Sequence, residues 1–142
     1  MSKDGGETFA VSPTGQTGGR LYASPAAEGD LWLATSSGLL HSIDAGVTFN
    51  KIGNAQAVFY LGFGKAAPYS NYPALYMSGQ VNNTVAIFRS TDAGATWQRI
   101  NDDRHQWGAV SPIIGDPRVF GRVYIGTNGR GIIRGDDPSA SE

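Results

Sequence analysis

Apolar residues come in short runs along the chain, and the runs are broken by Gly, Asn or Pro. Residues 30–35, 74–79 and 122–127, for example, combine aliphatic and aromatic side chains with Gly, Ser or Thr. Runs of this length between turn-forming residues are typical of strands and hairpins. No long stretch of the sequence shows the 3.6-residue hydrophobic period of an amphipathic helix. We therefore predict an all-β protein.

One eight-residue pattern occurs three times in the 142 residues, starting at residues 2, 42 and 90, so the spacings are 40 and 48 residues. The copies, called the first, second and third box below, are Ser2-Lys3-Asp4-Gly5-Gly6-Glu7-Thr8-Phe9, Ser42-Ile43-Asp44-Ala45-Gly46-Val47-Thr48-Phe49 and Ser90-Thr91-Asp92-Ala93-Gly94-Ala95-Thr96-Trp97. All three read Ser-x-Asp-x-Gly-x-Thr-aromatic, which is the Asp-box pattern. Their spacing is close to the four-strand repeat of a β-propeller blade.

Each repeated position of the box has a mechanical role in a tight turn. The Asp carboxylate accepts hydrogen bonds from backbone N–H groups of its own turn, and the Gly supplies a positive φ. The Thr returns the chain to strand geometry, and we expect the aromatic residue to enter the core between neighbouring sheets. The residues with these structural roles are Asp4, Gly6, Thr8, Phe9, Asp44, Gly46, Thr48, Phe49, Asp92, Gly94, Thr96 and Trp97.

Similar runs flank the boxes and predict four strands per blade, with the box joining the third strand to the outermost, or rim, strand. The first box precedes a lone rim strand at about 8–12, and the last blade has only three strands. The predicted organisation is a rim strand that completes a blade (1–14), two blades (15–54 and 55–101), an incomplete blade (102–136) and a tail (137–142).

The predicted fold is thus about three four-stranded antiparallel propeller blades with Asp-box turns. Propellers typically close with four to eight blades, so three form a partial ring or one that is completed by oligomerisation. Open edge strands invite pairing with another chain. Either the rest of a propeller lies beside these blades, or the chain is a homo-oligomer. A two-fold dimer would give six blades, with each N-terminal strand completing the partner's last blade.

Composition removes several functional classes. The formal net charge is −1 and the pI is about 6.1, so no basic excess is present to neutralise the phosphates of a nucleic acid. The chain has no Cys and only two His, and this predicts no transition-metal cluster and no cofactor. No apolar run approaches the length of a membrane helix, and residues 1–6 lack the apolar core of a signal peptide.

Longer runs outside the boxes carry a family resemblance. They are 62–68 with 72–76, 87–97, 99–108, 115–118 and 121–132, including Asn101-Asp102-Asp103-Arg104-His105-Gln106-Trp107-Gly108. In this order they resemble glycoside hydrolase family 74, of the xyloglucanase and oligoxyloglucan reducing-end cellobiohydrolase type, and the resemblance extends over nearly the whole chain. The resemblance places the chain in the C-terminal part of that family's second propeller. A sialidase is disfavoured because Phe88-Arg89 is followed by Ser90-Thr91 inside a box.

The resemblance implies a fragment or relative of an inverting endo-1,4-β-glucanase that acts on xyloglucan and is extracellular in the parent family. The family uses two catalytic aspartates, one from each propeller, and both lie upstream of anything aligned here. We therefore assign no catalytic residue and expect the isolated chain to be inactive. Two alternatives remain, a carbohydrate-binding module and a structural propeller module that assembles into a closed ring.

His105, Gln106 and Trp107 are the candidate substrate-binding residues. Imidazole and amide groups hydrogen-bond to sugar hydroxyls, an indole stacks on the apolar face of a pyranose, and the resemblance places this segment near the family's cleft. The alternative is a Trp packed under its loop, with His as a polar cover. Trp32 and Trp97 are expected in the core. Tyr60, Tyr69 and Tyr72 flank the Gly-Lys-Ala-Ala-Pro loop and are candidates for a second aromatic platform.

The remaining polar residues favour structural roles. Asp102 with Asp103 and Asp116 before Pro117 are expected to form turns, and His41 before a box Ser is expected to be structural. Asp136 and Asp137 lie near the end of the sequence and are expected to be solvated.

Overall fold

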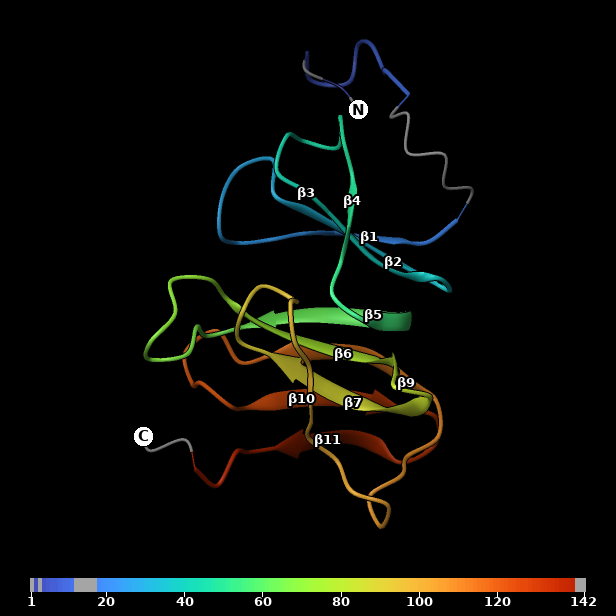
Figure 1. The fold of residues 1–142 in the computed structure, drawn as a ribbon, viewed down its shortest axis with the longest axis vertical. Coiled ribbons are helices and arrows are strands. Elements are labelled where there is room, and N and C mark those ends of the chain that lie inside the picture. Colours follow the sequence, from blue (N-terminus) through green and yellow to red (C-terminus); the bar gives the residue numbers. More distant parts are fainter. Residues whose placement is uncertain (1, 3, 12–17, 140–142) are drawn as a thin grey trace.

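The structure of the protein is a computed structural model that describes residue 2 and residues 4–11 and 18–139. Its described residues form three antiparallel sheets and no helix, which confirms the predicted all-β partial propeller. The sheets are stacked along the long axis of the molecule, with the first at one end, the second in the middle and the third at the other end (Figure 1).

Strand order in each sheet follows the chain, so each sheet is a simple meander. The first sheet contains β1 (Arg20–Ala23), β2 (Leu31–Thr35), β3 (Gly38–Ser42) and β4 (Asn50–Ile52). The second contains β5 (Ala55–Gly64), β6 (Ala74–Val81), β7 (Thr84–Ser90) and β8 (Gln98–Arg99). The third contains β9 (Val110–Gly115), β10 (Val123–Thr127) and β11 (Gly131–Gly135).

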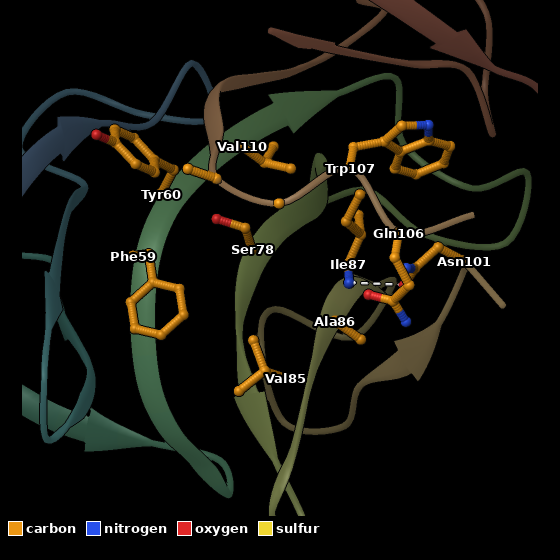
Figure 2. Close-up of a pocket in the computed structure, with 12 residues that line it drawn as sticks. Phe59, Tyr60, Ser78, Val85, Ala86, Ile87, Asn101, Gln106, Trp107 and Val110 are labelled. Atoms are coloured by element: carbon orange, nitrogen blue, oxygen red, sulfur yellow. Dashed lines mark hydrogen bonds between the residues drawn. The ribbon is translucent and has the colours of Figure 1, made fainter. Parts of the chain in front are cut away.

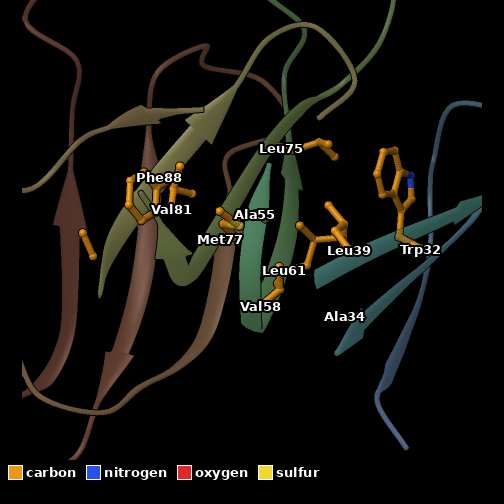
Figure 3. Packing of buried hydrophobic residues seen from close by; sticks show 11 residues of the cluster. Trp32, Ala34, Leu39, Ala55, Val58, Leu61, Leu75, Met77, Val81 and Phe88 are labelled. Atoms are coloured by element: carbon orange, nitrogen blue, oxygen red, sulfur yellow. The ribbon is translucent and has the colours of Figure 1, made fainter. Parts of the chain in front are cut away.

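Two apolar clusters hold the sheets together. The first lies between the first and second sheets and includes Trp32, Leu39, Leu61, Leu75 and Met77 (Figure 3). The second lies between the second and third sheets and includes Tyr76, Ile87, Ile113, Val123 and Ile125. Complete burial of such a side chain contributes roughly 1.5–3 kcal/mol, so both clusters stabilise the packing of the sheets.

The innermost strands of the second and third sheets approach each other very closely. A Cβ on Gly62 of β5 would lie 2.2 Å from the carbonyl oxygen of Ile113 of β9. That distance is far below van der Waals contact, so only glycine allows the two backbones to meet at this point.

The lone rim strand expected at 8–12, which would complete a blade outside these three sheets, stays a prediction. Residues 8–11 have no strand geometry, and Ser12 lies outside the described residues. A rim strand forms only beside a third strand of the same blade, and within the described part of the chain β3 and β7 already pair with β4 and β8.

Equivalent positions in the three sheets show what the third one lacks. Ser42 pairs with Leu31, Ser90 pairs with Leu75, and Gly135 pairs with Val123, each at the end of the third strand. After Ser42 and Ser90 the chain enters a box and returns as the rim strand. After Gly135 no further strand follows in the described residues, so the outer edge of β11 stays open.

Candidate functional site

The three boxes share one local geometry. In each, the backbone N–H of the Thr donates to the Asp carboxylate at 2.9 Å. The Ser hydroxyl accepts the N–H of the box Gly at 2.8 Å in the first box and 2.9 Å in the others. The hydroxyl and N–H of Thr48 lower the pKa of Asp44 to about 2. Each Asp is therefore an ionised turn-former that is occupied by its own loop.

Two features of the boxes differ from the sequence-based expectation. The residue before the box Gly also has a positive φ, 58° at Ala45 and 55° at Ala93. The box pattern specifies no residue type at this position, so the sequence did not indicate this conformation. The aromatic residue behaves differently among copies. Trp97 packs against the first cluster and Phe49 is half-buried, but Phe9 is 76% exposed. The expectation that each aromatic enters a core is wrong for Phe9, because no described sheet lies beside it.

A hollow of about 370 Å³ opens beside Trp107, between the second and third sheets (Figure 2). We call it the Trp107 hollow. Its wall is mostly apolar, and no charged side chain is among the described residues that line it. The lining residues are Phe59, Tyr60, Ser78, Val85, Ala86, Ile87, Asn101, Gln106, Trp107, Gly108, Ala109 and Val110.

Two irregularities in strand pairing lie beside this hollow. The pairing of β5 with β6 shifts register between Val58 and Tyr60, so Phe59 is the extra residue of a bulge. A second shift, between β9 and β10, follows Val110. Bulges bend a strand and redirect its side chains, and here both lie at the rim of the same hollow.

The loop that carries Trp107 is fixed by two side chains that follow β8. Asn101 accepts the N–H of Ile87 at 2.9 Å and donates to the carbonyl of His105 at 3.0 Å. Asp102 accepts the N–H groups of Arg104 and His105, both at 2.9 Å, and lies 2.6 Å from Nδ1 of His105. The contact with the His105 ring is the main cause that lowers the pKa of Asp102. Asp102 thus forms the turn that was expected of it.

The three candidate sugar-binding residues take different positions. Gln106 and Trp107 line the hollow, whereas His105 stands outside it with a side chain that is 62% exposed. The ring centroids of His105 and Trp107 are 6.0 Å apart. Trp107 also packs against the second cluster, so it combines the two predicted alternatives by contacting the core and lining the hollow.

The three tyrosines considered as a second platform do not come together. Tyr60 lines the Trp107 hollow, and its hydroxyl accepts a hydrogen bond from Arg20 at 3.0 Å. Tyr69 lies in the loop after β5 and is 80% exposed. Tyr72 is half-buried and bonded to the first sheet. Tyr60 lies within β5, whereas Tyr69 and Tyr72 lie in the loop that follows it, so only Tyr60 contributes to the hollow.

Comparison with known proteins agrees with this architecture. The BNR/Asp-box repeat family matches residues 88–99. A xyloglucanase from a Paenibacillus species is 51% identical over 122 residues, which are 82% of this chain and 12% of the relative. A xyloglucanase from Acetivibrio thermocellus is 49% identical over 98% of this chain and 17% of the relative. The crystal structure of a family 74 glycoside hydrolase from Niastella koreensis superposes with a TM-score of 0.81, at 40% identity over 86% of this chain and 18% of that chain.

These matches support the identification of the chain as a fragment of a glycoside hydrolase family 74 protein. The chain spans less than a fifth of the length of each of these relatives.

This family 74 chain contains a buried polar cluster that sequence analysis missed. Asp30 lies 2.7 Å from Nε2 of His41 and accepts the hydroxyl of Tyr72 at 2.6 Å. The indole of Trp32 stacks on His41 at 3.9 Å and donates to the Tyr72 oxygen at 2.9 Å. Burial, followed by the bond to Asp30, raises the pKa of Tyr72 to about 12. The cluster ties the second sheet to the first, so His41 is structural, as the sequence indicated.

The expectation that Asp137 is solvated is wrong. Its carboxylate forms an ion pair with Arg89 of β7, and both side chains are largely buried, at 15% and 10% exposure. A hydrogen bond from Ser139 is the main cause that lowers the pKa of Asp137 to about 2. Asp136 is more exposed and pairs with Arg122 and Arg134. Residues after β11 therefore join the second and third sheets of the family 74 chain.

Neither a metal-binding cluster nor a membrane-spanning helix is present in the described part of the chain. No group of three or more His, Cys, Asp or Glu side chains that could hold a metal ion is found among the described residues. No helix in residues 2, 4–11 and 18–139 is long and apolar enough to cross a membrane.

Proposed function

We propose that this chain is a blade segment of a xyloglucan-active β-glucan hydrolase and that it binds glucan at the Trp107 hollow. The observation that carries the proposal is the position of Trp107 and Gln106 on the wall of an uncharged, mostly apolar hollow. The relatives named xyloglucanase support the substrate class.

The chemistry of the wall suits a neutral sugar. A pyranose ring has an apolar face that an indole or phenyl ring can cover, and its hydroxyls need amide or hydroxyl partners. Trp107, Phe59 and Tyr60 supply the rings, and Gln106 supplies a polar group. A charged ligand would meet no opposite charge there, and an unpaired charge is costly to bury.

We further propose that the chain does not hydrolyse glucan by itself. Inverting hydrolysis needs two carboxyl groups about 6.5–9.5 Å apart, on either side of the scissile bond. No carboxylate is among the described residues that line the hollow. The nearest one along the chain, Asp102, is engaged by its own loop and by His105.

Calorimetric titration with a xyloglucan oligosaccharide tests this proposal. Trp107→Ala should weaken binding about tenfold or more, which corresponds to 1.4 kcal/mol or more of lost contact. Because Trp107 also packs against the second cluster, Gln106→Ala provides a variant that leaves the core intact and should weaken binding too. Tyr69→Ala, an exposed aromatic on another loop, is the matched control and should bind normally. Unchanged binding by both hollow variants, or release of reducing sugar by the wild-type chain, would contradict the proposal.

A second candidate is a self-associating propeller module, favoured by apolar side chains on the outer sheets. Leu21 and Ile43 are 61% and 78% exposed in the first sheet and its box, and Ile114 and Ile132 are 51% and 81% exposed in the third. Scattered apolar residues are normal on a surface, but these lie on the two sheets that have a neighbour on only one side.

We propose that two copies meet through these outer faces, and not by strand completion. Ser2 holds the same position in the first box as Ser42 and Ser90 hold in the other two boxes. Gly135, at the end of β11, has the same pairing position in its sheet as Ser42 and Ser90 have in theirs. If the residues after the first box paired with β11, Ser2 would therefore have to occupy the place of Gly135. Light scattering should give about twice the 15.0 kDa chain mass for the wild type and the single mass for Ile132→Lys, with Tyr69→Lys as control. A monomeric wild type would overturn this candidate.

A further inference from the structure

We propose that a second hollow, at the opposite end of β9 from Trp107, binds the carboxylate of a uronate ring in an acidic oligosaccharide. Trp107 precedes β9 in the chain, whereas Arg118, on the wall of this second hollow, follows it. The hollow has a volume of about 620 Å³ and lies among the segments that follow β5, β9 and β11. We call it the Arg118 hollow. The proposal goes beyond glucan binding at the Trp107 hollow and does not depend on it.

The wall of the Arg118 hollow has an excess of positive charge. Over the whole chain, 11 basic and 12 acidic residues nearly cancel. Four of the basic residues line this one hollow beside a single described carboxylate, and these residues are Lys65, Arg89, Arg118, Arg122 and Asp137. The Trp107 hollow, by contrast, has no charged side chain among its described lining residues. The positive charge is therefore concentrated locally, and it attracts an anionic ligand.

Two of the four cations are neutralised by the fold, and two are not. Arg89 and Arg122 form ion pairs with the two carboxylates that follow β11. The side chains of Lys65 and Arg118 form no ion pair or hydrogen bond with any described residue, and both residues are exposed. A ligand can therefore reach them. A guanidinium group donates two parallel hydrogen bonds to one carboxylate, and an ammonium group adds a second positive charge.

Hydrogen bonds hold the three segments in place around the hollow. The N–H of Lys65 donates to the carbonyl of Asp116 at 2.8 Å, and the N–H of Asp137 donates to the carbonyl of Gly121 at 3.0 Å. The Asp116 carboxylate accepts the backbone N–H of Arg118 at 2.8 Å, so it fixes this loop without using the Arg118 guanidinium. Because the backbone is already ordered, binding costs less conformational entropy.

The same wall offers an apolar surface for a sugar ring. Pro68 and Tyr69 line the hollow on the same loop as Lys65, and Tyr69 is 80% exposed. An aromatic ring can cover the apolar face of a pyranose while a nearby cation binds its carboxylate. A bare phosphate ion would use the cations alone and leave most of the 620 Å³ empty. A uronate ring uses both kinds of group, so it is the ligand class that fits this wall.

Calorimetric titration with a galacturonate trimer at low ionic strength tests the proposal. Arg118→Gln should weaken binding about threefold to tenfold, because it removes one exposed ion pair with the ligand. Arg130→Gln is the matched control and should bind normally. Arg130 is also exposed and without an ion pair among the described residues, but it lies beyond the far end of β10 and does not line the hollow. The fully methyl-esterified trimer, which has the same rings without the charge, should bind at least tenfold more weakly than the free acid.

Several results would overturn the proposal. If the wild type does not bind the trimer, the site does not exist. Equal losses for Arg118→Gln and Arg130→Gln would indicate general charge attraction, and equal affinities for the free acid and the ester would show that the carboxylate is not recognised. Inorganic phosphate that binds as tightly as the trimer would show that the hollow takes a bare oxyanion. Neither arginine side chain bonds to the described fold, so both variants should keep the wild-type Tm. Failure of xyloglucan binding at the Trp107 hollow would leave this inference standing.

Discussion

The first and third boxes have nearly the same hydrogen bonds in very different surroundings. Thr8 and Thr96 both donate to their box Asp at 2.9 Å. Yet Trp97 packs against the first cluster, whereas Phe9 is 76% exposed. The turn is therefore specified by eight local residues, whereas its contribution to global stability depends on a neighbouring sheet. This difference predicts that equivalent substitutions in the two boxes have unequal effects.

The largest effect is expected where the third box meets the first sheet. Trp32 is completely buried and lies directly against Gly94 of that box. Trp32→Ala should lower the free energy of unfolding by about 3–5 kcal/mol, because it opens a cavity and leaves the Tyr72 oxygen without one partner. Urea denaturation measures this effect. Phe9→Ala is the control and should stay within about 0.5 kcal/mol. Similar losses for both variants would contradict the comparison.

A matched pair of glycines should give an intermediate difference. Gly94 and Gly6 have φ of 81° and 98°, so Ala is strained by about 1–2 kcal/mol at either site. At Gly94 a Cβ would also lie 3.2 Å from Ile52 and 3.3 Å from the Trp32 ring, while at Gly6 the nearest atom is 3.8 Å away. Gly94→Ala should therefore cost about 1–3 kcal/mol more in global unfolding than Gly6→Ala. Equal Tm values for the two variants would show that the third box is not pressed against the first sheet.

The smallest effect is expected from acid. The Thr48 hydrogen bonds lower the pKa of Asp44 from its usual 3.8 to about 2, so folding favours the ionised form. The resulting stability is fully present above the unfolded-state pKa and is lost as the pH falls from about 4 towards 2. Asp44→Asn should flatten this part of the pH dependence of unfolding. Asp4→Asn should leave it unchanged, because the first box is not part of the described sheets. A flattened profile for Asp4→Asn would mean that the first box unfolds together with the sheets.

Much of the fold could be predicted because its signals are local. The box pattern and the short apolar runs indicated the strands from β1 to β11, since turn chemistry and strand propensity act within a few residues. The rim strand expected at 8–12 is not formed by residues 8–11, because strand formation also needs a pairing partner and these residues pair with no described strand, although the outer edge of β11 is open.

The site was only partly predictable for a related reason. The sequence pointed to Gln106 and Trp107 because indole and amide groups in one loop suit a sugar, and both residues line the hollow. Phe59 has no such signal, since its role depends on a bulge and on a neighbouring sheet. Tyr72 was misplaced because its partner Asp30 is 42 residues away in the sequence. Long-range packing of this kind leaves no periodic trace in the chain.

The central claim is that the Trp107 hollow binds glucan. Nuclear magnetic resonance of the three tryptophan indole N–H groups tests it most directly. The chain has Trp32, Trp97 and Trp107, and Trp107→Phe assigns the third signal. During titration with a xyloglucan oligosaccharide, the Trp107 signal should shift progressively. The Trp32 signal should stay in place, because that indole is buried and bonded to Tyr72, and the Trp97 signal should stay because its box lies outside the hollow. A stationary Trp107 signal at saturating ligand, or a shift confined to Trp97, would contradict the account.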